Sequence, residues 1–158
     1  MILDAGTTAV QMVSHLHQTG ALTVVTNAIN VAIELRVLPD AQVILLGGSL
    51  SYTTFSSSGP LADQGLEDVV VQKLFLGAQS VDLNAGVTDT SLEIARVKRA
   101  MIRAAQHVIL VADSSKWGRP GFVKVAPLSA IHTVITDTNL PREAQLVIER
   151  SGTGLILV

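Results

Sequence analysis

Lys98 is the residue whose position in the sequence most suggests a binding role. The apolar spacing predicts a helix over about residues 91–105, in which Ile94, Met101 and Ile102 share a face with Lys98. An ammonium group on the buried side of a helix needs an anionic partner or a path to water. The side chain therefore either extends to the surface or points to an anion, such as a bound phosphate or an acidic residue.

The segment Asp113-Ser114-Ser115-Lys116 offers a carboxylate, two hydroxyl groups and an amine directly after an apolar run. Lys116 could neutralise an anion there, while Asp113 or Ser114 binds hydroxyl groups of the same ligand. A polar turn in which Asp113 acts as a cap is the alternative interpretation.

A third candidate is the small-residue turn Asp4-Ala5-Gly6-Thr7-Thr8, which suits an anion at the start of a helix. Thr7 or Thr8 as a plain helix cap explains the same residues. The turn lacks the lysine of a P-loop and the glycine spacing of a dinucleotide fingerprint, so NTPase and Rossmann cofactor sites are disfavoured. Because Asp4 would repel a phosphate, we expect it to meet hydroxyl groups or a lysine.

These candidates must be positioned by strands. Four short apolar runs stop at an acidic or amide residue, namely at Asp4, Asn27, Asp113 and Asp137. In an open parallel sheet the carboxyl ends of the strands meet at one edge, and ligands bind there. The pattern predicts an α/β fold, with a mostly parallel sheet, helices on both faces and a crevice at that edge. A content of 48% hydrophobic but only 3% aromatic residues suits strands that are buried on both faces.

The other elements follow from turn residues and periodicity. Strands are expected at 2–4, 22–26, 42–46, 69–76, 107–112, 133–136 and 155–158, a short extended piece within 120–128, and helices at about 8–17, 28–37, 61–68, 91–105 and 141–151. The polar stretch 49–60 is expected to be a flexible loop, either a surface connection or a lid over a ligand.

Length and composition limit the function classes. The 158 residues predict a single domain, and a net charge of −2 without a basic run argues against DNA binding by this chain alone. The absence of cysteine excludes disulfides and thiolate metal sites, and the histidines lack a metal-ligand spacing, so we expect no metal and no cofactor. No membrane span or signal peptide is visible, and we expect a cytoplasmic protein. Because an apolar strand starts at residue 2, we expect that an N-terminal portion is absent.

Seven short motifs, in this order, resemble the C-terminal effector-sensing domain of DeoR-type bacterial transcriptional regulators. They are Leu3-Asp4-Ala5-Gly6-Thr7-Thr8, Val24-Val25-Thr26-Asn27, Leu46-Gly47-Gly48, Phe75-Leu76-Gly77-Ala78, Glu93 with Val97-Lys98-Arg99-Ala100-Met101, Ala112-Asp113-Ser114-Ser115-Lys116 and Ile135-Thr136-Asp137.

The resemblance implies a fold shared with ribose-5-phosphate isomerase and glucosamine-6-phosphate deaminase. It implies a phosphorylated sugar as effector, and DNA binding only through an absent N-terminal helix-turn-helix module. By motif match, the phosphate would be held by Gly6, Thr7, Thr8, Lys98 and Lys116. The resemblance also implies four residues that contact the sugar hydroxyl groups or position the lysines, namely Asp4, Asn27, Glu93 and Asp113. The remaining residues of the expected site are Thr26, Gly47, Gly48, Gly77 and Ser114.

Two alternatives remain beside a sensor that binds without turnover. One is an aldose-ketose sugar-phosphate isomerase. The resemblance implies that isomerases of this fold carry an acidic motif, which supplies the catalytic base, where this sequence reads Leu76-Gly77-Ala78-Gln79-Ser80. Gln79 cannot serve as a base, although Asp82 follows closely. The other is a purely structural oligomerisation module. Because regulators that read palindromic sites are usually symmetric, we also expect a homo-oligomer.

Overall fold

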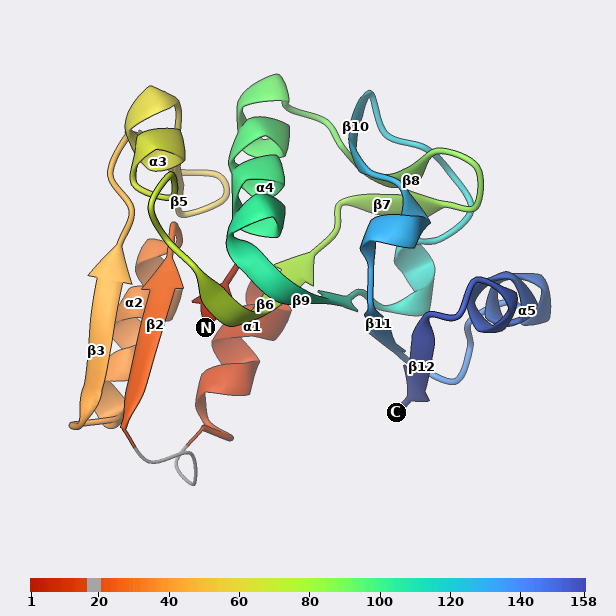
Figure 1. Ribbon diagram of the computed structural model, residues 1–158, viewed down its shortest axis with the longest axis horizontal. Helices are drawn as coiled ribbons and strands as arrows, with labels where there is room; N and C mark the ends of the chain where they lie inside the picture. The colour runs from red at the N-terminus through yellow and green to blue at the C-terminus, as the bar shows by residue number, and fades with distance from the viewer. Residues whose placement is uncertain (17–20) are drawn as a thin grey trace.

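The structure is a computed structural model that describes residues 1–16 and 21–158. A seven-stranded parallel sheet with the strand order β12-β11-β9-β6-β1-β2-β3 forms its centre (Figure 1). Its strands are β1 (Ile2–Leu3), β2 (Leu22–Thr26), β3 (Ala41–Leu45), β6 (Val71–Gly77), β9 (Ala105–Val111), β11 (Thr133–Thr136) and β12 (Gly154–Leu157). The predicted α/β fold with a mostly parallel sheet is confirmed.

Helices cover both faces of this sheet. They are α1 (Thr7–Val13), α2 (Ile29–Glu34) with the 3-10 turn η1 (Leu35–Val37), α3 (Pro60–Gln64), α4 (Leu92–Ala104) and α5 (Arg142–Arg150). The neighbouring residues Ile2 and Leu3 of β1 point to opposite faces and belong to two separate apolar clusters. Leu3 packs in the cluster that contains α1 and α2, and Ile2 in the cluster that contains α4 and α5. The first helix was predicted to continue to about His17, with Gly20 ending that unit. It ends at Val13, and positions 17 and 20 lie outside the described residues.

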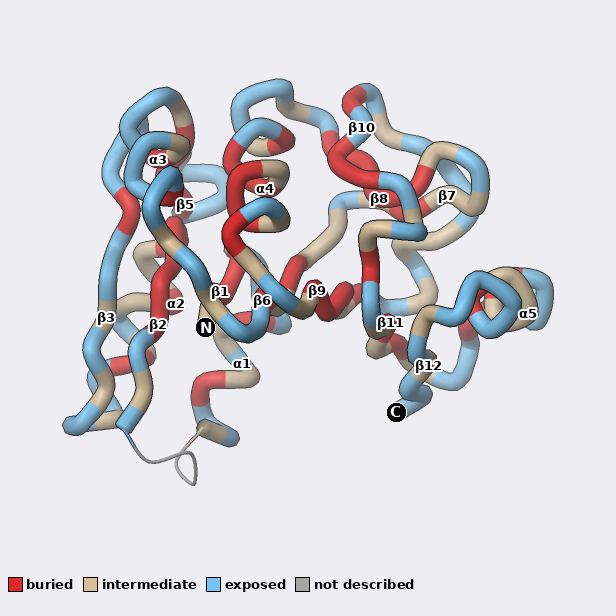
Figure 2. The backbone as a smooth tube through the Cα atoms, viewed as in Figure 1, coloured by how far each residue is buried: buried red, intermediate tan, exposed pale blue. Residues whose placement is uncertain are grey.

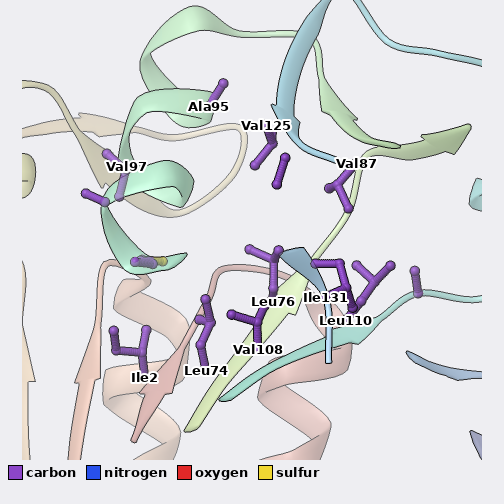
Figure 3. Packing of buried hydrophobic residues seen from close by; sticks show 14 of the residues in the cluster. Ile2, Leu74, Leu76, Val87, Ala95, Val97, Val108, Leu110, Val125 and Ile131 are labelled. Atoms are coloured by element: carbon purple, nitrogen blue, oxygen red, sulfur yellow. The ribbon is translucent and has the colours of Figure 1, made fainter. Parts of the chain in front are cut away.

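The larger cluster fills the space between the sheet and α4. Figure 3 shows side chains of the strands, among them Leu74, Leu76 and Val108, beneath those of Val97 and Ala95 on the helix. Burial is greatest in the inner strands, whereas much of β3 and β12, at the two edges of the sheet, is exposed (Figure 2).

Two small antiparallel sheets complete the fold. Strands β7 (Ser80–Asp82), β8 (Gly86–Asp89) and β10 (Val123–Ala126) form one, with β8 in its centre. The other is a hairpin of β4 (Ser49–Ser51) and β5 (Ser56–Ser58), in the segment predicted to be a flexible loop. The segment is not an irregular loop, because the serines of β5 are buried and hydrogen-bonded rather than solvated. The turns η2 (Ser114–Lys116) and η3 (Leu128–Ala130) are short 3-10 segments.

Helix α4 is the element that carries Lys98 toward the sheet. The hydroxyl of Ser91 caps it by accepting a hydrogen bond from the backbone N–H of Ile94 at 3.4 Å. Its buried face includes Lys98 and Met101 of the predicted stripe, together with Val97. The other two predicted members, Ile94 and Ile102, are half-buried. No helix in the described part of the chain is long and apolar enough to cross a membrane.

Candidate functional site

A cavity of about 600 Å³ opens at the carboxyl edge of the parallel sheet. It is lined by the turns that follow β1, β2, β6 and β9, by the start of α4 and by the tip of the β4–β5 hairpin. Nine of the residues predicted for the site line it, namely Asp4, Gly6, Thr7, Thr8, Asn27, Gly77, Lys98, Asp113 and Lys116. Lys98 and Lys116, which are 18 positions apart in the sequence, therefore share one cavity.

Lys98 lies at the floor of this cavity between two carboxylates. Its Nζ atom is 3.4 Å from Oδ2 of Asp4 and 3.2 Å from Oδ2 of Asp89, and it donates a hydrogen bond to the carbonyl of Gly77 at 2.9 Å. Burial alone would lower the pKa of Lys98, but the two carboxylates outweigh burial and raise its pKa above the ordinary value. The ammonium is thus charged and already fully committed to acceptors of the protein.

Asp4 connects the ends of two neighbouring strands. Its Oδ1 accepts a hydrogen bond from the N–H of Ala5 at 2.8 Å, and its Oδ2 accepts one from the N–H of Gly77 at 3.1 Å. With Lys98 as a third partner, this carboxylate holds β1, β6 and α4 together. Its contacts match the expected pairing with a lysine.

Asp89 is the residue of this cluster that sequence reasoning missed. It is 4% exposed, lines the cavity and accepts hydrogen bonds from the N–H groups of Thr90 and Ser91 at 2.8 and 3.3 Å. A signal was present, because Asp89 ends a strand directly before a helix, as Asp4 does. It was overlooked because β8 belongs to the small antiparallel sheet and not to the predicted parallel one.

Lys116 provides the uncommitted positive charge. It lies half-buried on η2, and no carboxylate of the described residues comes within 4.0 Å of its amine. Its turn is fixed by Asp137, whose Oδ2 accepts a hydrogen bond from the N–H of Ser114 at 2.6 Å. This bond and a second one from the N–H of Asn139 lower the pKa of Asp137 to about 2. Asp113 accepts a hydrogen bond from the N–H of Ser115 at 2.9 Å and caps the turn, as the alternative interpretation proposed.

Five residues of the expected site do not line the cavity. Thr26 is fully buried, and its hydroxyl accepts a hydrogen bond from the N–H of Ala28. Ser114 has its N–H bound to Asp137. Glu93 is exposed on the first turn of α4, where it accepts a 3.4 Å hydrogen bond from the hydroxyl of Ser58.

Gly47 and Gly48, the other two, shape the entry to the hairpin. Gly48 has a φ of 124°, and a Cβ atom placed there would lie 2.3 Å from the carbonyl oxygen of Ser58. The backbone of β5 therefore approaches this position so closely that only glycine fits. Gly47 is exposed and contributes to the same turn.

The two residues that bear on the isomerase alternative lie in different places. Gln79 lines the cavity. Asp82 does not, and its Oδ1 accepts hydrogen bonds from the N–H groups of Asn84 and Ala85 at 2.9 and 2.7 Å. This carboxylate therefore closes the β7–β8 turn.

The fold and the cavity place the chain among α/β proteins that have a polar cleft at the carboxyl edge of a parallel sheet. The family model described as the DeoR C terminal sensor domain matches residues 1–138, and the chain belongs to this family. Curated relatives include the regulator GlpR of Haloferax volcanii, 36% identical over 99% of this chain and 61% of the relative. YulB of Bacillus subtilis is 41% identical over 89% of this chain and 54% of the relative.

The putative aga operon transcriptional repressor of Escherichia coli O157:H7 is 31% identical over 100% of this chain and 59% of the relative. The chain thus spans between 54% and 61% of the length of these three transcriptional regulators. Among solved structures, ribose 5 phosphate isomerase A from Neisseria gonorrhoeae matches with a TM-score of 0.48 and 16% identity, over 74% of this chain and 45% of the isomerase.

Proposed function

We propose that this chain is the effector-sensing domain of a DeoR-type transcriptional repressor of sugar metabolism, and that it binds a phosphorylated sugar without turnover. The observation that carries this proposal is the ammonium of Lys116, which has no carboxylate partner among the described residues, in a cavity whose polar lining consists of hydroxyl, amide and carboxylate groups beside apolar side chains such as Phe55 and Phe75. A cation together with groups that can bind hydroxyls in one cavity suits a ligand that carries both an anionic group and hydroxyl groups.

The phosphate would lie between Lys116 and the turn Gly6-Thr7-Thr8, which lines the same cavity. Lys98 would act indirectly, because its charge is shared between Asp4 and Asp89. Without Lys98, two buried carboxylates would face the incoming anion and repel it. Lys98 would therefore act without touching the phosphate: its positive charge offsets the negative charge of Asp4 and Asp89 and so reduces their repulsion of the bound anion.

The sugar hydroxyl groups would meet the oxygen and nitrogen atoms at the other walls. Asn27, Asp113 and Gln79 line the cavity from the turns after β2, β9 and β6. These side chains offer both donors and acceptors, as hydroxyl groups require.

Binding without turnover is supported by the chemistry of the lining. Aldose-ketose isomerisation needs a carboxylate that can take a proton from the substrate carbon. Gln79 cannot do this, Asp82 does not line the cavity, and the carboxylates of Asp4 and Asp89 are paired with Lys98. The remaining carboxylate of the lining, that of Asp113, accepts hydrogen bonds from the backbone N–H and the hydroxyl of Ser115 and caps its own turn. We therefore favour a sensor over an isomerase.

The rest of the regulator is inferred from the relatives. We propose that DNA is bound through an N-terminal helix-turn-helix module outside this chain, that the regulator is a homo-oligomer, and that it works in the cytoplasm, where its operator is. The net charge of −2 supports the view that this part does not bind DNA itself.

A thermal-shift screen tests the proposal. Ribose 5-phosphate, fructose 1-phosphate, fructose 6-phosphate, glucose 6-phosphate and inorganic phosphate are each added to the chain. A true effector at about 100 times its dissociation constant should add roughly 2.7 kcal/mol of stability. If no phosphorylated sugar raises the melting temperature, a structural oligomerisation module is the better explanation. Measurable isomerisation of ribose 5-phosphate that Asp82→Asn abolishes would favour the enzyme.

A further inference from the structure

The β4–β5 hairpin is joined to the turn after β2 by a continuous set of hydrogen bonds. The backbone N–H of Ser57 donates to the carbonyl of Asn27 at 2.8 Å, and the N–H of Ile29 donates to the carbonyl of Phe55 at 2.8 Å. Between them, Ala28 and Ser56 form an antiparallel bridge. The second strand of the hairpin thus extends along the cavity wall beside Asn27.

The side chain of Asn27 takes part in this connection with only one of its two ends. Its Nδ2 donates to the carbonyl of Ser57 at 2.9 Å, whereas its Oδ1 is buried and accepts no hydrogen bond from any described residue. Asn27 is 3% exposed and lines the cavity. Asn30 lines the same cavity, but its Oδ1 is satisfied by the N–H of Val31 at 3.0 Å. The unsatisfied acceptor belongs to a residue that lines the cavity, so a ligand hydroxyl group that reaches it would supply the missing donor.

The tip of the hairpin has features of a movable cover. Thr53, Thr54 and Phe55 line the cavity. Phe55 has a φ of 50°, the single positive value of a non-glycine residue in the described ranges. For a bulky aromatic residue this conformation is strained, and it persists only where neighbouring contacts hold it. The hydrogen bond from Ile29 to the Phe55 carbonyl is such a contact.

We propose that Asn27 couples occupancy of the cavity to the order of the β4–β5 hairpin. A hydroxyl group of the bound ligand donates to Oδ1 and fixes the plane of the amide, because both ends of the group then have partners. The bond from Nδ2 to the Ser57 carbonyl becomes stronger within this chain of hydrogen bonds, and the hairpin tip is held over the ligand. This inference rests on the proposed function, because the ligand must carry both the phosphate and the hydroxyl group.

Limited chymotrypsin digestion measures the order of the tip directly. Tyr52 and Phe55 are 80% and 53% exposed, and Phe122, which does not line the cavity, is 84% exposed. Cleavage after Tyr52 and Phe55, relative to cleavage after Phe122, is followed by mass spectrometry with and without the strongest-binding sugar phosphate of the screen. We expect the sugar phosphate to slow relative cleavage by roughly five-fold or more, a typical size for coupling between sites. Inorganic phosphate should stabilise the protein without this protection.

Variants then separate the inference from the proposed function. In Asn27→Ala, and in Asn27→Ser, whose side chain is too short to contact both partners, the sugar phosphate should bind more weakly because one hydroxyl contact is lost. At a concentration that saturates each variant, it should protect the tip less than about two-fold. Asn30→Ala is the matched control and should retain the protection. Unchanged protection in both Asn27 variants, or equal protection by inorganic phosphate, would overturn the coupling alone. If no sugar phosphate binds the unmodified chain, the proposed function fails and the coupling fails with it.

Discussion

The carboxylate of Asp4 accepts a hydrogen bond from the backbone N–H of Gly77 at 3.1 Å, although 73 positions separate the two residues. The carbonyl of the same Gly77 accepts the hydrogen bond of Lys98. One glycine thus connects the ends of β1 and β6 to the centre of α4. A Cβ atom at Gly77 would lie 3.1 Å from the carbonyl oxygen of Ala5, so the backbones approach closely at this point.

Replacing Lys98 should destabilise the fold. In Lys98→Met, the carboxylates of Asp4 and Asp89 remain buried without their shared cation. Removing one partner from a buried ion pair costs about 3–5 kcal/mol, and urea unfolding should show a loss of this size. Lys73→Met, on an exposed position of β6, is the control and should change little. If Lys98 held only the phosphate, as the resemblance implied, its replacement would leave the fold intact. A stable Lys98→Met variant would mean that the two carboxylates have other partners.

Replacing Lys116 should instead affect binding. Lys116→Ala removes no ion pair described in the structure, so the free energy of unfolding should change by no more than about 0.5 kcal/mol. A hydrogen bond to a charged group contributes about 1.5–3 kcal/mol, so the affinity for a sugar phosphate should fall by roughly ten-fold or more. Isothermal titration calorimetry gives both affinities. Lys124→Ala, exposed and outside the cavity, should bind as the unmodified chain does.

The two glycines before the hairpin should respond differently to alanine. Gly48→Ala places a Cβ atom 2.3 Å from the Ser58 carbonyl oxygen at a φ of 124°, and we expect a loss of about 1–3 kcal/mol of stability. Gly47→Ala meets only the Cβ of Leu61 at 4.0 Å and should be tolerated. Thermal unfolding of the two variants tests this pair. Equal losses would indicate that the close approach of β5 to Gly48 is not what requires glycine there.

The pH dependence of stability should reveal Asp137. Hydrogen bonds from the N–H groups of Ser114 and Asn139 lower its pKa from 3.8 to about 2. Because the folded-state pKa is lowered, the carboxylate stabilises the fold fully above pH 3.8, and this contribution is lost as the pH falls toward 2.

Asp137→Asn keeps an acceptor but removes the titrating group. The difference in melting temperature between the unmodified chain and this variant should be constant at neutral pH and shrink between pH 4 and 2. Asp40→Asn controls for the loss of an exposed carboxylate. A difference that stays constant down to pH 2 would contradict the assignment.

The sequence predicted the elements in which local pattern and tertiary environment agree. The apolar runs around Val24, Val108 and Val134 are buried strands of the parallel sheet, and the periodicity around Lys98 is that of a helix. The hairpin and the small antiparallel sheet were not predicted in this form, because their strands are only three or four residues long. Their serines and glycines read locally as loop residues. Backbone pairing within the β4–β5 and β7–β8 hairpins and between β8 and β10 makes them strands.

The sequence alone determined that polar residues end several parallel strands, because side-chain type and strand order along the chain decide which groups reach the carboxyl edge. Only the tertiary structure decided the partners of these groups. It places Asp89 beside Lys98 and directs Glu93 to the hairpin. Of the two lysines that line the cavity, it leaves Lys116 without a carboxylate neighbour among the described residues. Such assignments depend on distances of 3–4 Å between segments that are remote in the sequence, and no local pattern encodes those distances.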